Sequence, residues 1–192
     1  ELARKKQWLE AYDGWYYVIE NCPQSNKNNV IYGPYIVEAK LKEAKKAGDA
    51  AAETKFKNML LEVYDKRNKY FPGQEGYVYA RKALDVVQHF PDSSQMAYDL
   101  FKKALEIDGP EQSAAFYNYY FVTAARLFND DVFEVEDVFN AYNLVIEGIE
   151  VNTSSLNKTI SNYSYERDSN AVALTDKQKS ELAKAERELE RY

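Results

Sequence analysis

Residues 97–110 read AYDLFKKALEIDGP, and this stretch decides the fold expected of the chain. It places small residues at Ala97 and Ala104, an aromatic ring at Phe101 and a proline at Pro110. In a helix, the small residues let a neighbouring helix approach, the ring fills the gap between helices, and the proline ends the segment. The stretch therefore predicts a helix that is one member of a packed pair.

The same spacing recurs at three other places along the chain. The copies are Ala11, Trp15, Val18 and Pro23; Leu60, Tyr64, Arg67 and Pro72; and Val138, Tyr142 and Val145 without a proline. Successive aromatic positions are 49, 37 and 41 residues apart, whereas a regular array of helix pairs has a period of about 34. The pattern predicts lengthened, degenerate repeats.

Helices are expected throughout, because only 7 Gly and 5 Pro interrupt 192 residues and most of them fall between segments with helical apolar spacing. Pro34 is expected either to kink the second helix or to delay its start to Gly33. Ser94, Pro110 with Glu111, and Thr175 with Gln178 are expected at helix starts. The predicted helices span 2–20, 28–46, 50–70, 76–89, 94–107, 111–128, 134–148, 153–165 and 175–191.

The order of small residue, aromatic, small residue and proline is similar to the second helix of the tetratricopeptide repeat, and residues 97–105 match it best. The first-helix half departs from the family, since Arg81 and Leu84-Asp85 stand where a Trp and a Leu-Gly pair are usual. The resemblance covers residues 2–165. It implies an all-α fold of stacked antiparallel helix pairs forming a right-handed, tetratricopeptide-like α-solenoid.

We expect three segments along the chain, because the polar and charged residues 166–170 separate the repeats from a final helix. Residues 1–165 form the repeat array, 166–174 a linker, and 175–192 a C-terminal helix that caps the array or begins a following domain. The stretches 21–25 (NCPQS) and 70–73 (YFPG) also resemble exported tetratricopeptide proteins of Gram-negative bacteria. This second resemblance implies the periplasm or cell envelope, and the cytoplasm stays open as an alternative.

In such a stack the first helices line a groove that binds partners. The helix from residue 76 places Tyr79, Lys82 and His89 on one stripe, and the next first helix places Tyr117 and Phe121 on the corresponding face. Tyrosine suits extended peptides, because it offers a large area and a hydrogen-bonding tip at low entropic cost. These five residues are the predicted contacts for a protein or peptide, and an ordinary solvated face is the competing interpretation.

Charge and motifs exclude several other functions. The net charge is −6 with no long basic block, which argues against nucleic acid, and no apolar run reaches the length of a membrane span. Cys22 and His89 are single residues of their kind, the carboxylates of 130–137 lack the spacing of a calcium loop, and no phosphate-binding loop is present. We therefore expect no metal, no cofactor and no enzymatic activity.

A carbohydrate-binding module is the alternative from another class, because exposed aromatic rings stack on sugar faces. The composition includes 17 Tyr, 9 Phe and 2 Trp. Trp15 occupies the core position of the first repeat copy, which leaves Trp8 as the candidate platform for a glycan. The exposure of the two indoles distinguishes the alternatives.

Overall fold

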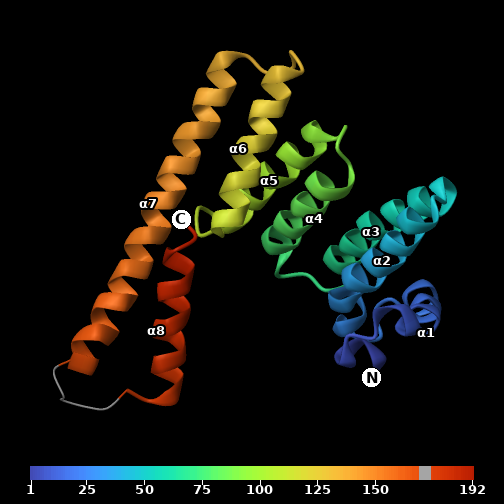
Figure 1. Cartoon of the computed structure of the whole chain (residues 1–192), viewed down its shortest axis with the longest axis horizontal. Helices are drawn as coiled ribbons and strands as arrows, with labels where there is room; N and C mark the ends of the chain where they lie inside the picture. The colour runs from blue at the N-terminus through green and yellow to red at the C-terminus, as the bar shows by residue number, and fades with distance from the viewer. Residues whose placement is uncertain (169–173) are drawn as a thin grey trace. The chain divides into compact units, whose positions relative to one another are not determined.

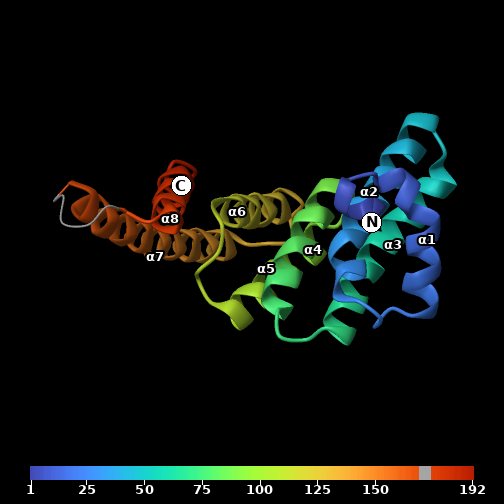
Figure 2. The same ribbon diagram turned by 90° about the horizontal axis from the view of Figure 1, so that it is seen from below.

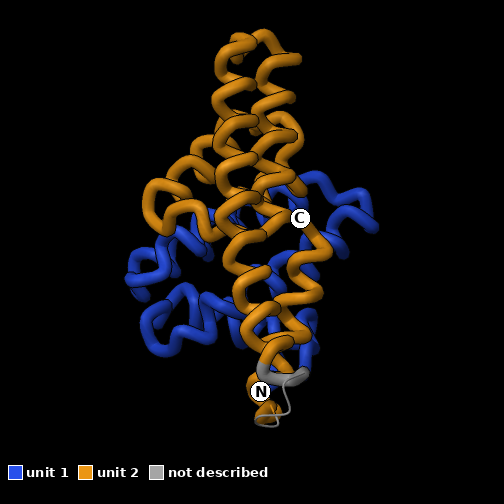
Figure 3. Tube along the Cα trace, turned by 90° about the vertical axis from the view of Figure 1, so that its left-hand side faces the viewer, with its two compact units in different colours: residues 1–82 blue, residues 83–192 orange. Residues whose placement is uncertain are grey.

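The computed structural model describes residues 1–168 and 174–192, in which every regular element is helical (Figure 1). The all-α prediction is confirmed for these residues. The chain divides into two compact units, Glu1–Lys82 and Ala83–Tyr192, drawn in separate colours in Figure 3. Each unit is described below by itself.

Unit 1 consists of a short 3-10 helix followed by three helices and the first half of a fourth. The elements are η1 (Leu2–Lys5), α1 (Trp8–Asn21), α2 (Lys27–Ala47), α3 (Ala50–Tyr70) and α4 (Glu75–His89), whose last turns belong to unit 2. The prediction of one helix over 2–20 is wrong at its start. Lys6 adopts a left-handed conformation with φ 58°, which ends η1 before α1 begins.

Pro34 does not delay the start of α2, which begins at Lys27. The Asn26 side chain accepts a hydrogen bond from the Asn28 backbone N–H at 2.9 Å, and α2 runs from Lys27 through Pro34 without ending. Gly33, which precedes the proline, is closely packed by side chains of two neighbouring helices. A Cβ there would lie 2.7 Å from Val63 Cγ1 and 3.0 Å from Trp15 Cζ2, so α1 and α3 both approach α2 at this glycine.

The core of unit 1 gathers the repeat positions predicted to be buried. Trp15 and Tyr64 are 7% and 2% exposed, and both lie in one apolar cluster with Ile19, Val37 and Leu60. Helices that are adjacent in sequence, α1 with α2 and α2 with α3, pack against each other. The first two copies of the repeat pattern therefore place their rings between helices, as the spacing predicts.

Unit 2 contains the last turns of α4 and four further helices, α5 (Ser94–Asp108), α6 (Ala114–Asn129), α7 (Val135–Asp168) and α8 (Asp176–Leu189). From α5 to α8 each helix packs on the next, and α7 and α8 lie side by side in both ribbon views (Figures 1 and 2). The core is aromatic. Phe101 of α5 is fully buried against Phe116 and Tyr120 of α6, with ring centroids 4.9 and 6.2 Å away.

One predicted helix cap and one predicted helix start in unit 2 are wrong, although the predicted start at residue 94 agrees with α5. Helix α5 begins at Ser94 itself, and its N-cap, Ser93, makes no side-chain cap hydrogen bond. Helix α6 begins at Ala114 rather than near Pro110, because the Ser113 hydroxyl accepts the Phe116 N–H at 3.3 Å and supplies the N-cap. Pro110 therefore belongs to the loop between the two helices.

Helix α7 is one continuous helix of 34 residues, and the prediction of separate helices over 134–148 and 153–165 is wrong. Its polar middle bonds back to the preceding turn. The Asn152 amide donates to the Gly148 carbonyl at 2.6 Å, and the Thr153 hydroxyl donates to the Ile149 carbonyl at 2.7 Å. These bonds satisfy the two polar side chains along the helix, and α7 continues past them despite their low helix propensity.

The C-terminal helix starts with the capping box predicted from Thr175 and Gln178, and both hydrogen bonds of the box are present. Leu182 and Ala185 are buried where α8 packs on α7. The predicted linker, 166–174, overlaps the end of α7 at Asp168. The rest of it, apart from residue 174, lies outside the described residues.

Candidate protein-binding face

The predicted contact residues on α4 fall in both units. Tyr79 and Lys82 belong to unit 1, where Tyr79 is half-buried and the Lys82 ammonium lies 2.5 Å from an Asp65 carboxylate oxygen. His89 belongs to unit 2 and is 5% exposed. Helix α4 therefore offers a half-buried ring and an ion-paired cation on unit 1, and a buried imidazole on unit 2.

Tyr117 and Phe121 are brought together by one turn of α6. Tyr117 is buried, and its hydroxyl donates to the Pro110 carbonyl at 2.5 Å. Burial, followed by the neighbouring Tyr192 and Glu147, raises the pKa of Tyr117 to about 12. Phe121 is half-buried and meets the Tyr142 ring of α7 edge-on, with centroids 6.2 Å apart.

Both residues line a pocket where α6, α7 and the end of the chain meet, which we call the α6–α8 pocket. Its volume is about 320 Å³, and its lining residues are Ala114, Tyr117, Asn118, Phe121, Val145, Ile149, Arg191 and Tyr192. Rings and aliphatic side chains form most of this lining. An amide at Asn118 and a guanidinium at Arg191 are its polar groups apart from the two phenols.

The wall formed by Tyr192 was not predicted from the sequence. The Tyr192 hydroxyl donates to the Gln112 carbonyl at 2.5 Å, which joins residues 80 positions apart. Burial, followed by the charge of Glu188, raises the pKa of this phenol. The signal was the apolar stripe of Leu182, Ala185, Leu189 and Tyr192, which required a partner surface but did not identify it.

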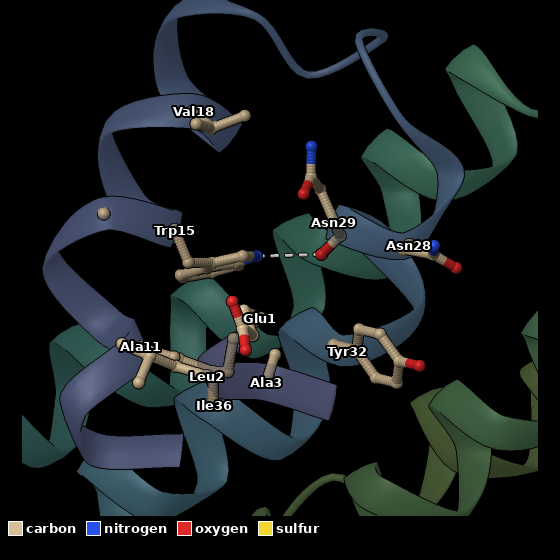
Figure 4. Close-up of a pocket in the computed structure, with 11 residues that line it drawn as sticks. Glu1, Leu2, Ala3, Ala11, Trp15, Val18, Asn28, Asn29, Tyr32 and Ile36 are labelled. Atoms are coloured by element: carbon tan, nitrogen blue, oxygen red, sulfur yellow. Dashed lines mark hydrogen bonds between the residues drawn. The ribbon is translucent and has the colours of Figure 1, made fainter. Parts of the chain in front are cut away.

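A second pocket, of about 260 Å³, lies in unit 1 between η1, α1 and α2 (Figure 4). The Trp15 indole N–H donates to the Asn29 carbonyl at 2.8 Å, so the polar edge of the ring is already bonded within the chain. Glu1, Leu2 and Ala3 form another part of the lining. The pocket is mainly apolar and contains none of the five predicted contacts.

The exposure of the indoles bears on the carbohydrate alternative. Trp15 is buried at 7% exposed, as its repeat position predicts. Trp8 is half-buried, and one face of its indole is stacked on Tyr35 at a centroid distance of 5.4 Å with the planes 21° apart. Tyr32 lies 6.2 Å away at a tilt of 40°. A sugar would have to use the part of Trp8 that these tyrosines leave open.

Cys22 is an exposed thiol at the C-terminal end of α1. Within residues 1–168 and 174–192, no group of three His, Cys, Asp or Glu is placed to hold a metal ion. No helix in this described part is both long and apolar enough to cross a bilayer.

Comparison of the chain with protein-family models, with curated proteins and with solved structures finds no match.

Proposed function

We propose that this chain is a non-catalytic protein-binding scaffold, built as a tetratricopeptide-like array of antiparallel helix pairs, whose α6–α8 pocket receives a side chain of a peptide or partner helix. The observation that carries the proposal is the meeting of Tyr117 and Phe121 at this pocket. Both were predicted as partner contacts from their helix face. Tyr79, Lys82 and His89 stay as predicted contacts outside the pocket.

The lining of the pocket suits a peptide side chain. Its volume of about 320 Å³ is at the lower end of the range of ligand sites, so one bulky apolar side chain fits better than a large cofactor. Asn118 is exposed beside it and offers both a donor and an acceptor to a peptide backbone. The combination of an apolar anchor and polar rim groups is typical of peptide recognition.

We further propose a location in the periplasm or cell envelope, following the resemblance of residues 21–25 and 70–73 to exported proteins. Fractionation of the source cells followed by immunodetection tests this location. Recovery in the cytoplasmic fraction would contradict it without affecting the binding proposal.

The binding proposal is tested by selecting peptides from a random display library on the whole chain and measuring their affinity for two variants. Phe121→Ala removes a pocket wall, and Tyr17→Ala removes a ring that is 69% exposed on unit 1. We expect the selected peptides to bind Phe121→Ala about tenfold more weakly, because hot-spot rings contribute more than 1 kcal/mol. Tyr17→Ala is expected to bind them as the parent does.

Two outcomes contradict the proposal. Peptides that bind Phe121→Ala and the parent equally would remove the α6–α8 pocket as the site. No selected peptide, together with retardation of the chain by a soluble polysaccharide in affinity electrophoresis, would favour the carbohydrate-binding alternative. A Trp8→Ala variant that abolished this retardation would then identify the platform.

A further inference from the structure

The first half of α7 leaves a row of apolar side chains in solvent, which we call the α7 stripe. It consists of Val135, Phe139, Tyr142 and Ile146, which are 54%, 62%, 48% and 37% exposed. Their intervals of four, three and four residues place them on one face of the helix. Contiguous exposed apolar residues mark interaction sites more often than scattered ones do.

The stripe has a hollow at its N-terminal end. Phe128, Val135, Val138 and Phe139 enclose about 140 Å³ between the end of α6 and the start of α7. All four lining side chains are apolar. The hollow can hold an aliphatic side chain from outside and gives the stripe an anchor point.

The α7 stripe continues a face of α7 that another helix already covers. Further along α7, Tyr163 donates to the Glu181 carboxylate of α8 at 2.5 Å, and α8 extends from there until Tyr192 lies beside Val145 and Ile149 in the pocket. Ile149 follows Ile146 by three residues, so the covered and uncovered parts share one side of the helix. The element that this side accepts is a helix.

The repeat pattern leads to the same conclusion. Phe101, the aromatic of its copy, is covered by Phe116 and Tyr120 of the following helix. Tyr142 is the aromatic at the equivalent position in α7, yet it is 48% exposed and its ring contact is with Phe121 of the preceding helix. The position that a following helix fills in the earlier copy is open here.

The segment that carries the stripe is acidic, and this bears on the chemistry of a helix that would cover it. Residues 127–157 contain seven carboxylates and no Lys, Arg or His. None of them takes part in a salt bridge within the described residues. The seven are Asp130, Asp131, Glu134, Glu136, Asp137, Glu147 and Glu150.

We propose that the α7 stripe binds a basic amphipathic helix of a partner protein, with its apolar face on the stripe and its Lys and Arg residues against the flanking carboxylates. This inference rests on the proposed function and names its partner class. The acidic segment disfavours other occupants, because a second α7 stripe, an anionic lipid surface or a nucleic acid would bring like charges together.

The probe is a labelled synthetic helix of about 18 residues, long enough to span the stripe at 1.5 Å per residue. It carries Leu at positions i, i+3, i+4 and i+7 and Lys elsewhere. One matched peptide replaces Lys by Glu, and a second replaces Leu by Ser. Fluorescence anisotropy with the whole chain measures each affinity. The salt concentration is about 0.15 M, at which charges more than about 8 Å apart are largely screened, so that only close charge pairs contribute.

Two variants test the two parts of the surface, each with a control from the same unit. Val135→Ser with Phe139→Ser removes apolar area and is matched by Met96→Ser with Ile107→Ser, which are also exposed. Glu134→Gln, Glu136→Gln and Glu147→Gln together remove charge. Their control is the set of exposed residues Glu106→Gln, Glu186→Gln and Glu190→Gln. Thermal unfolding verifies that every variant is folded.

We expect the Leu–Lys peptide to bind, the two control peptides to bind at least about tenfold more weakly, and each stripe variant to lose about tenfold in affinity. The matched variants should change by less than about twofold. Equal losses in the stripe and control variants, or equal binding of the Leu–Glu peptide, would overturn the inference. So would a concentration-dependent dimer that Val135→Ser with Phe139→Ser abolishes, since a second copy would then occupy the stripe.

The failure of this inference and that of the proposed function are distinguishable. Library peptides that require Phe121 while the Leu–Lys peptide fails to bind would overturn the α7 stripe and leave the α6–α8 pocket in place. A Leu–Lys peptide that binds through Phe139 while no library peptide depends on Phe121 would support the stripe and remove the pocket. Failure of both arms would overturn both.

Discussion

The ring of Tyr117 lies directly on the backbone of Gly148, and a Cβ added at that glycine would overlap the Cζ and hydroxyl of the tyrosine. This contact brings α6 and α7 together behind the α6–α8 pocket. Gly148 itself is buried, and Asn152 joins the same cluster by donating to the Pro110 carbonyl, the acceptor that Tyr117 also uses. A small residue is therefore required in the middle of α7.

Gly148→Ala is expected to lower the free energy of unfolding by about 2–3 kcal/mol, because neither the buried ring nor the helix backbone can move away freely. Far-ultraviolet circular dichroism during urea unfolding measures the loss. Adding Tyr117→Leu to Gly148→Ala should recover part of it. A double variant that loses the sum of the single effects would show that the two positions are not coupled.

Gly14→Ala provides the opposite case within a helix. A Cβ at Gly14 meets nothing within 4 Å, and the residue is inside α1. The substitution is expected to raise the free energy of unfolding by about 0.5–1 kcal/mol, since alanine restricts the unfolded chain and favours the helix. Emission from Trp8 and Trp15, the chain's two tryptophans, follows this unit during urea unfolding. An unchanged or lower midpoint would contradict the prediction.

The phenol of Tyr117 gives unit 2 a stability that is lost in alkali. Its pKa is about 12 in the folded chain against an ordinary value of 10.0. The unfolded chain therefore releases this proton first as the pH rises. The folded state binds more protons between pH about 10 and 12, and stability falls across that window, by up to about 1.4 kcal/mol per pH unit.

Tyr117→Phe should flatten this alkaline loss, although the variant starts about 1 kcal/mol less stable at neutral pH because the bond to Pro110 is gone. Urea unfolding at a series of pH values from neutral to alkaline measures the difference. Tyr17→Phe, which removes a phenol from a ring that is 69% exposed, serves as the matched variant. Parallel slopes for the parent and Tyr117→Phe would contradict the assignment.

Thr175→Ala removes the N-cap of α8, where the threonine hydroxyl accepts from the Gln178 N–H at 3.3 Å and the Gln178 side chain accepts from the Thr175 N–H at 2.9 Å. We expect a loss of about 1 kcal/mol. Hydrogen exchange followed by mass spectrometry should show faster exchange in α8 first. Thr175→Ser keeps the hydroxyl and should exchange as the parent does; equal exchange in Thr175→Ala would show that the cap contributes little.

Much of the helical pattern could be predicted because local chemistry determines it. Thr175 caps α8, and Ala97, Phe101 and Ala104 are buried as their spacing predicts. The prediction that the helix ends after residue 148 is wrong. Gly148, Asn152 and Thr153 have low helix propensity, but propensity takes no account of the Tyr117 ring or of the bonds back to the preceding turn. Tertiary contacts override propensity at such positions.

The candidate site could be predicted only in part. Tyr117 and Phe121 share a helix face that the sequence shows directly, and the structure places them in one pocket. Tyr192 forms another wall through a bond across 80 residues, and no local pattern encodes a contact at that separation. The exposure of Tyr142 could not be predicted either. The repeat pattern predicts a buried ring at this position, but the ring is buried only if a following helix covers it.

Because α7 is one continuous helix, it sets the distance and the angle between the surfaces at its two ends. Each residue of a helix adds about 1.5 Å and turns the side-chain direction by about 100°, so residue count alone fixes the offset and angle between the α7 stripe and the Tyr163–Glu181 contact. One residue inserted near Asn152 would rotate the stripe out of line with α8 while leaving both surfaces intact. The length of α7 thus determines how the two surfaces are aligned. We expect α7 to tolerate insertions less well than surface loops do.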